Sequence, residues 1–171
     1  MIISLLGYMG SGKSHISKNL SKKINFKLID LDQQISDEHQ LTIPEIFEKK
    51  GEIYFRKEEK RILEELLNSD ENLILSLGGG TPVYYDNMNI INQKSKSIFL
   101  RASVNTLTNR VLLQKNTRPL IAKLEDSDIP EFIAKHLFER NPFYSKAHLT
   151  IDTDSKNAIE ISDEIIKKLE I

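Results

Sequence analysis

The chain has 171 residues, of which 39% are hydrophobic, and this is enough to form the core of one ordinary domain. Its formal net charge is −1, so it lacks the overall positive field with which proteins bind nucleic acid or an anionic membrane. The absence of cysteine excludes disulfides, thiolate metal sites and a cysteine nucleophile. The apolar stretch Met1–Leu6 is too short for a signal peptide, and no apolar run has membrane-spanning length. We therefore expect one cytoplasmic domain, residues 1–171, with neither nucleic acid nor a membrane as partner.

Five short apolar runs alternate with amphipathic segments along the chain. The runs are predicted strands: Ile2–Leu6, Phe26–Ile29, Leu73–Leu77, Ser97–Leu100 and Leu149–Ile151. Because these runs mostly lack alternation of apolar and polar residues, we expect helices to cover both faces of the sheet. Strands that alternate with helices predict a doubly wound parallel sheet of the α/β class.

Helical periodicity fills the intervals between several of these strands. Apolar stripes with helical spacing occur at residues 16–24, 55–67 and 158–169. Thr42-Ile43-Pro44-Glu45 has the pattern of a capping box that begins a short helix. Another helix is predicted to begin at Asp128-Ile129-Pro130-Glu131 and to end at Pro142, because proline disfavours continuation of a helix.

The segment at about residues 112–127 is polar and lacks clear periodicity. Long loops in compact domains are commonly lids or binding loops. We therefore predict a lid in this segment, which contains Arg118.

Six of the seven glycines fall into two tight groups, and the first group carries a phosphate-binding motif. Gly7-Tyr8-Met9-Gly10-Ser11-Gly12-Lys13-Ser14 matches the P-loop pattern GxxxxGK[ST] between a predicted strand and a predicted helix. In such a loop backbone N–H groups point at phosphate oxygens, and the lysine bridges the β and γ phosphates. The Ser14 hydroxyl is expected to reach Mg²⁺. The residues expected to bind ATP here are Gly10, Ser11, Gly12, Lys13, Ser14 and His15.

Two aspartates follow the second predicted strand. In many P-loop ATPases a later strand ends in a magnesium-binding aspartate, but Leu73–Leu77 continues into Gly78 without one. Asp30 and Asp32 lie instead at the carboxyl end of the second strand, the edge where α/β sheets bind ligands. Residues two apart in an extended chain face the same side, so both carboxylates are expected to point into the crevice. One can then assist Mg²⁺ while the other acts as general base.

Arginine is much rarer than lysine in this chain, and its planar fork suits carboxylate and phosphate groups. Arg56 has Glu59 three residues later on the same helix face, close enough to hold the guanidinium. Arg118 could reach the transferring phosphate when the lid closes, as an arginine finger. Arg140 lies in the helix beyond the lid, and the second glycine group, Gly78–Gly80, would let a small polar substrate lie against the main chain.

These motifs together resemble those of the shikimate kinases. The matching segments, in the family's order, are the P-loop Gly7–Ser14, Asp30-Leu31-Asp32, Phe55-Arg56-Lys57-Glu58-Glu59, Ser76-Leu77-Gly78-Gly79-Gly80, Arg118-Pro119-Leu120-Ile121 and Glu139-Arg140-Asn141-Pro142-Phe143-Tyr144. The P-loop alone is shared by many families, whereas the remaining set is far more specific. The resemblance implies a three-layer P-loop kinase fold with five parallel strands, a lid and a helical substrate-binding segment at about residues 32–62.

The resemblance also implies an activity and roles for individual residues. The activity is transfer of the ATP γ-phosphate to the 3-hydroxyl of shikimate, on the pathway to chorismate and aromatic amino acids. Asp32 would deprotonate that hydroxyl, Arg56 and Arg140 would bind the substrate carboxylate, and Gly78–Gly80 would contact the ring hydroxyls. Asp30 would support Mg²⁺ through water. Lys13 and the lid residue Arg118 would act on the phosphates, and the family is usually monomeric.

The chain departs from the usual family pattern at two places. The family often packs adenine between an arginine before the lid and a proline after the last strand. Arg110 can fill the first role, but Ala158 stands where proline is common. Thr81-Pro82 replaces a more usual small and apolar pair, which is expected to alter the shape of the loop rather than its chemistry.

Two other functions remain open at this point. One is a related P-loop kinase that acts on a sugar acid such as gluconate or on a nucleotide. The other is a non-catalytic nucleotide-binding switch, although a mere binder needs neither a base such as Asp32 nor a finger such as Arg118. The four histidines show no metal-ligand spacing, and we interpret them as structural or surface residues.

Overall fold

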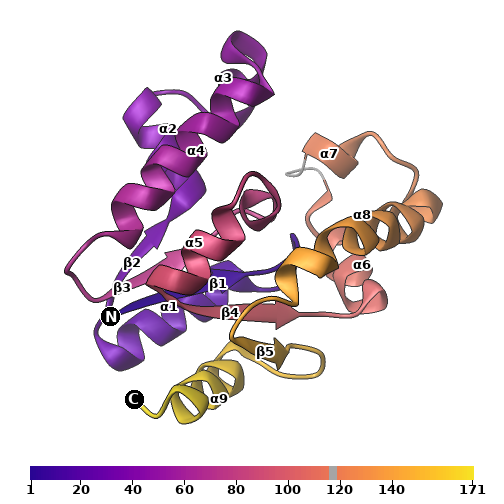
Figure 1. The fold of residues 1–171 in the computed structure, drawn as a ribbon. Coiled ribbons are helices and arrows are strands. Elements are labelled where there is room, and N and C mark those ends of the chain that lie inside the picture. Colours follow the sequence, from indigo (N-terminus) through magenta and orange to yellow (C-terminus); the bar gives the residue numbers. More distant parts are fainter. Residues whose placement is uncertain (116–118) are drawn as a thin grey trace.

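The computed structural model describes residues 1–115 and 119–171. A five-stranded parallel sheet with the order β2-β3-β1-β4-β5 forms its centre (Figure 1). The strands are β1 (Ile2–Leu6), β2 (Lys27–Asp30), β3 (Leu73–Ser76), β4 (Lys96–Arg101) and β5 (Leu149–Asp152). All five predicted strands are thus confirmed, and their ends differ from prediction by at most one residue. None of the helices in the described ranges has the length and apolarity needed to cross a membrane.

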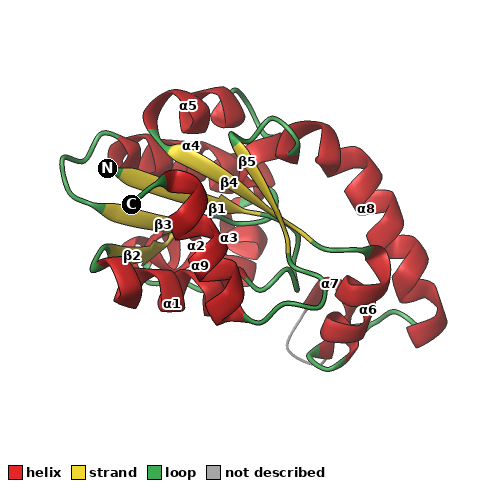
Figure 2. Ribbon diagram, turned by 90° about the horizontal axis from the view of Figure 1, so that it is seen from below, coloured by secondary structure: helices red, strands yellow, loops and turns green. Residues whose placement is uncertain are grey.

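Helices cover both faces of this sheet. The helices of the described residues are α1 (Lys13–Ile24), α2 (Leu31–His39), α3 (Ile43–Lys50), α4 (Glu52–Leu67), α5 (Asn87–Lys94), α6 (Val104–Leu112), α7 (Pro119–Ala122), α8 (Ile129–Tyr144) and α9 (Ala158–Leu169). Figure 2 shows α1 and α9 on one face and α5 on the other. The three-layer α/β fold class is therefore confirmed.

The apolar residues of β1 explain the two layers of core. Ile3 and Leu5 belong to a buried cluster with Ile16 of α1 and Ile161 of α9. Ile2 and Leu6 belong to a second cluster that includes the apolar faces of α4, α5, α6 and α8. Successive side chains of a strand point to opposite faces, so a fully apolar strand can fill two cores. The edge strand β2 differs, because Lys27 is exposed and its other residues are only partly buried.

Local signals define several helix ends. Thr42 and Glu45 form the predicted capping box at the start of α3, with both reciprocal hydrogen bonds present. Gly51 lies between α3 and α4 with φ 84°, a conformation that glycine adopts without strain. The helices α5 and α6 were not predicted, because their polar and β-branched residues are weak helix formers. Packing on the sheet stabilises them instead.

The predicted end of α8 at Pro142 is wrong, since the helix continues to Tyr144. Tyr144 is fully buried, and its hydroxyl donates a 2.5 Å hydrogen bond to the Gly79 carbonyl oxygen. These tertiary contacts retain the last turn although proline removes one helix hydrogen bond.

The predicted lid segment, about residues 112–127, contains more regular structure than its sequence pattern indicates. It includes the end of α6, the short helix α7 and a 3-10 turn at Asp126–Asp128. Arg118, the predicted finger, lies outside the described residues.

Candidate active site

A cleft of about 820 Å³ opens at the carboxyl ends of the strands. It lies where the loops after β1, β2 and β3 meet, as expected for a parallel α/β sheet. Every predicted site residue in the described ranges lines it. These residues are Gly10, Ser11, Gly12, Lys13, Ser14, His15, Asp30, Asp32, Arg56, Gly78, Gly79, Gly80, Arg110 and Arg140.

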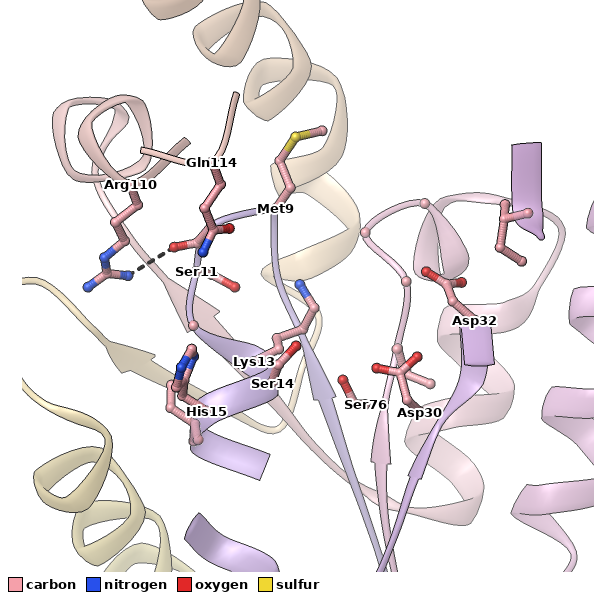
Figure 3. A pocket seen from close by; sticks show the side chains of 18 of the residues that line it. Met9, Ser11, Lys13, Ser14, His15, Asp30, Asp32, Ser76, Arg110 and Gln114 are labelled. Carbon is pink, nitrogen blue, oxygen red and sulfur yellow. Dashed lines mark hydrogen bonds between the residues drawn. The ribbon is translucent and has the colours of Figure 1, made fainter. Parts of the chain in front are cut away.

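The P-loop connects β1 to α1 on one side of the cleft (Figure 3). Gly10 and Gly12 have φ values of 82° and 94°, and Gly12 directly precedes the first residue of α1. The Lys13 ammonium group donates hydrogen bonds to the carbonyl oxygens of Gly7 (2.7 Å) and Tyr8 (3.1 Å). The loop therefore combines a helix N-terminus with a lysine held across it, which together favour bound phosphate.

Asp30 and Asp32 lie opposite the P-loop (Figure 3), and of the two only Asp30 has the extended backbone that was predicted, as the last residue of β2. Helix α2 begins at Leu31, so Asp30 is its N-cap and Asp32 belongs to its first turn. The Asp30 side chain accepts a 3.2 Å hydrogen bond from the Gln33 backbone N–H. Both carboxylates still reach the cleft, because the turn from strand to helix keeps them at the same sheet edge.

Asp32 lies in an environment that disfavours its charged form. Burial is the main cause, the charges of Asp30 and Glu59 add to it, and together they raise the pKa of Asp32 from 3.8 to about 6. The positive charges of Lys13 and Arg56 act in the opposite direction. The carboxylate is thus largely ionised at neutral pH and is a stronger base than an exposed aspartate.

The glycine turn after β3 brings three predicted site residues together. A Cβ atom at Gly78 would lie 2.9 Å from an Asp32 carboxylate oxygen, and one at Gly79 would lie 3.0 Å from Arg140 Nη1. A Cβ atom at Gly80 would lie 2.9 Å from both Arg56 Nη1 and Nη2. Each glycine therefore makes room for a different functional side chain, and a carboxylate and two guanidinium groups converge on one turn.

Arg56 is mostly buried and is held on several sides. Its Nη1 donates a 2.9 Å hydrogen bond to Glu59, and Glu52 lies 3.6 Å from its Nε. The ring of Tyr84 stacks against the guanidinium, with its centroid 3.9 Å from Cζ. The predicted Arg56–Glu59 pair is confirmed.

Arg140 has aromatic and main-chain neighbours. Its guanidinium carbon is 5.4 Å from the centre of the Tyr8 ring, and it lies beside Gly79 and the Tyr144 hydroxyl. The Tyr8 hydroxyl is hydrogen-bonded to His136 Nδ1 at 3.0 Å. None of these neighbours carries a negative charge, which favours binding of an anionic ligand by Arg140.

The other end of the cleft is formed by α6 and the loop after β5. Arg110 donates hydrogen bonds to the carbonyl oxygens of Gly10 (3.1 Å) and Thr153 (3.3 Å), which links the P-loop to that loop. Gln114, Lys156 and Ala158 line the same end.

Sequence reasoning missed some of the residues that line the cleft, among them Phe47, Ser76, Gln114 and Lys156. Ser76 is the last residue of β3, at the position where many P-loop proteins carry an aspartate. This position could have identified Ser76 as a site residue from the sequence. Lys156 follows the last strand, and its residue type alone did not indicate that it lines the cleft. No cluster of three acidic or histidine side chains that could hold a metal ion occurs in residues 1–115 and 119–171.

Comparisons with known proteins agree on one family. A profile described as shikimate kinase matches residues 9–170. A shikimate kinase of Flavobacterium psychrophilum is 46% identical over 169 residues, which cover 98% of each chain. The crystal structure of a Bacteroides thetaiotaomicron shikimate kinase covers 100% of this chain and 99% of its own, with 34% identity and a TM-score of 0.93. A shikimate kinase from Acinetobacter baumannii, solved in complex with shikimate, covers 99% and 92%, with 31% identity and a TM-score of 0.88.

Proposed function

The chain belongs to the shikimate kinase family, and we propose that its cleft transfers the γ-phosphate of ATP to the 3-hydroxyl of shikimate. The products are shikimate 3-phosphate and ADP, on the pathway to chorismate and the aromatic amino acids. The observation that carries the proposal is the convergence of Asp32, Arg56 and Arg140 on the glycine turn opposite the P-loop.

The acceptor half of the cleft suits a small anion that carries hydroxyl groups. Arg56 and Arg140 lie beside adjacent glycines, where two guanidinium groups can bind one carboxylate. The substrate ring would then lie against the main chain of Gly78–Gly80, with its 3-hydroxyl toward Asp32. In this arrangement the substrate carboxylate fixes the orientation of the ring, and Asp32 selects the hydroxyl that reacts.

The reaction is an in-line displacement at phosphorus. The 3-hydroxyl oxygen attacks the γ-phosphorus, Asp32 takes the hydroxyl proton, and the bond from the γ-phosphorus to the β–γ bridging oxygen breaks. ADP leaves with that oxygen. Lys13 neutralises charge on the β and γ phosphates during the transfer, and the P-loop N–H groups hold them in place.

The nucleotide half of the cleft extends from the P-loop to Arg110. We place the adenine beside Arg110, within reach of Lys156 in the loop after β5 and of Ala158, the first residue of α9. Arg118 is proposed as the lid arginine on the phosphates, on the family resemblance alone.

The donor groups in the cleft fit a magnesium ion bound together with ATP. The Ser14 hydroxyl and the Asp30 carboxylate line the same cleft, and both are hard oxygen ligands. Mg²⁺ keeps several waters and needs few protein ligands, so Ser14 directly and Asp30 through water would hold it. When bound, the ion supplies positive charge to the phosphate oxygens.

A panel of phosphate acceptors tests the proposal. ADP release with Mg-ATP is measured for shikimate, gluconate and nucleoside monophosphates. We expect turnover with shikimate alone. Turnover with gluconate or a nucleoside monophosphate and none with shikimate would assign a related kinase activity, and ATP binding without any turnover would indicate a nucleotide switch.

A further inference from the structure

Thr81 is a fully buried polar residue directly after the glycine turn. Its hydroxyl donates a 2.7 Å hydrogen bond to Glu59 Oε1. Its carbonyl oxygen accepts a 2.9 Å hydrogen bond from the side-chain amide of Asn87, which is also fully buried. Thr81 is therefore fixed through both its main chain and its side chain, and the orientation of its hydroxyl is determined.

Glu59 connects Thr81 to Arg56. Its side chain is 1% exposed, and its two oxygens have different partners, Thr81 on Oε1 and Arg56 Nη1 on Oε2. A buried carboxylate oxygen without a hydrogen-bond donor is costly, so both donors are needed to hold this carboxylate in one orientation. Thr81, Glu59 and Arg56 thus form a continuous hydrogen-bonded chain beneath the acceptor half of the cleft.

Glu59 is the buried carboxylate that accepts a hydrogen bond from the Arg56 guanidinium. The ring of Tyr84 packs on the guanidinium face, which restricts its plane but leaves rotation within the plane. Among the described residues, the buried Nε of Arg56 has no hydrogen-bond partner, and Glu52 is a more distant and half-exposed neighbour. The 2.9 Å bond from Nη1 to Glu59 is a directional contact with a buried carboxylate.

We propose that Thr81 is a positioning residue for substrate binding: it orients Glu59, which in turn orients Arg56 toward the carboxylate of the acceptor. This inference rests on the proposed role of Arg56 as a ligand of that carboxylate. It goes beyond the expectation that Thr81-Pro82 alters the shape of the loop rather than its chemistry, because the threonine hydroxyl contributes a buried hydrogen bond.

Two substitutions at position 81 separate the hydroxyl from the shape of the side chain. Thr81→Val removes the donor and keeps the branched shape, whereas Thr81→Ser keeps the donor. We expect Thr81→Val to raise the KM for shikimate about tenfold, the usual effect of losing a hydrogen bond to a charged group, while the KM for ATP stays within about twofold. Thr81→Ser should restore the KM for shikimate to near the original value.

Thr108→Val is the matched control. Thr108 is another buried threonine, on α6, and its hydroxyl has no hydrogen-bond partner among the described residues. Its replacement should leave the KM for shikimate unchanged. The proposal is overturned if Thr81→Val and Thr108→Val behave alike, or if Thr81→Val raises the KM for ATP as much as that for shikimate.

A double-mutant cycle tests the route through Glu59. In a Glu59→Gln background, Thr81→Val should change the KM for shikimate by much less than tenfold, since the residue it acts through is already altered. An undiminished effect would contradict this route. If Thr81→Val does not fold, Thr81→Ala and Thr81→Ser replace it, and an equal KM for shikimate in these two variants overturns the proposal.

Arg56→Ala distinguishes failure of this inference from failure of the proposed function. An unchanged KM for shikimate in Arg56→Ala would refute the carboxylate role of Arg56 itself. A raised KM in Arg56→Ala with no effect of Thr81→Val would refute only the positioning role of Thr81.

Discussion

Asp32 is a base whose strength comes from its surroundings. Burial and two neighbouring carboxylates, Asp30 and Glu59, raise its pKa to about 6, while Lys13 and Arg56 limit the increase. The sequence indicated the residue type and the sheet edge but not this pKa. Glu59 comes from α4 and is 27 positions away, so its charge reaches Asp32 only through the fold.

The raised pKa predicts an acid limb in the rate profile. Because the ionised form accepts the substrate proton, kcat/KM for shikimate should fall about tenfold for each pH unit below 6. Asp32→Asn should lower kcat at least about a hundredfold and keep the affinity for ATP. Steady-state kinetics between pH 5 and 8 check this. A flat profile down to pH 5, or full activity of Asp32→Asn, would remove Asp32 from the mechanism.

The same carboxylate should lower the stability of the fold. Its pKa of about 6 in the folded state lies above the value of 3.8 taken for an exposed aspartate, so the folded state binds the proton more tightly. Protonation of Asp32 therefore adds to the free energy of unfolding. This contribution is fully present below pH 3.8 and is lost as the pH rises through 6. Above that pH the ionised form costs about 3 kcal/mol, from two pKa units at 1.36 kcal/mol each.

We therefore predict that Asp32→Asn unfolds at higher denaturant concentration than the original chain at pH 8. The gain should reach at most about 3 kcal/mol at pH 8 and should shrink as the pH approaches 4. Urea unfolding at several pH values measures it. Equal stability at pH 8 would show that the folded protein solvates this charge well.

At the scale of elements, the sequence predicted those strands and helices that have a regular apolar pattern or a capping motif. The strands and the helices α1, α4 and α9 follow from apolar runs and stripes, and α3 from its capping box. The helices α5 and α6 depend on packing that a local pattern does not contain. Asp32 was placed on a strand for the same reason, because nothing local showed that α2 begins at Leu31.

The glycine turn after β3 is the element that assembles the acceptor site. Gly78→Ala would place a Cβ atom 2.9 Å from an Asp32 oxygen and 3.1 Å from the Thr81 hydroxyl. We expect kcat to fall about a hundredfold, because a displacement of about 1 Å at the base is costly in rate. The KM for ATP should change little. Steady-state kinetics with both substrates measure this.

Gly51→Ala gives the opposite pattern and serves as its control. Gly51 has a positive φ of 84° and no atom near the site of a new Cβ, so alanine there strains the backbone without touching the cleft. We expect a lower melting temperature with kcat retained. If Gly78→Ala loses only stability and keeps kcat, the close approach of this turn to Asp32 has no catalytic role.

At the scale of the whole molecule, every described part of the proposed site comes from one chain. We therefore propose a monomer that folds as a single domain. Sedimentation should give a species of 19.7 kDa, and thermal unfolding should show a single transition. A second transition would indicate that α2–α4 or the lid unfolds separately, and a dimer whose dissociation abolishes activity would contradict a site complete in one chain.

The order of strands in the sheet sets the distance between donor and acceptor. The P-loop follows β1, the base follows β2, and β3 with its glycine turn lies between them. Adjacent strands are about 4.8 Å apart, so the sheet holds the two loops about 10 Å apart at their starting points. This spacing is maintained by backbone hydrogen bonds across three strands and does not depend on any side chain in the cleft. Substitutions in the cleft can therefore change ligand affinity, proton transfer or local charge. The separation between the strand ends that carry the P-loop and the base remains constant.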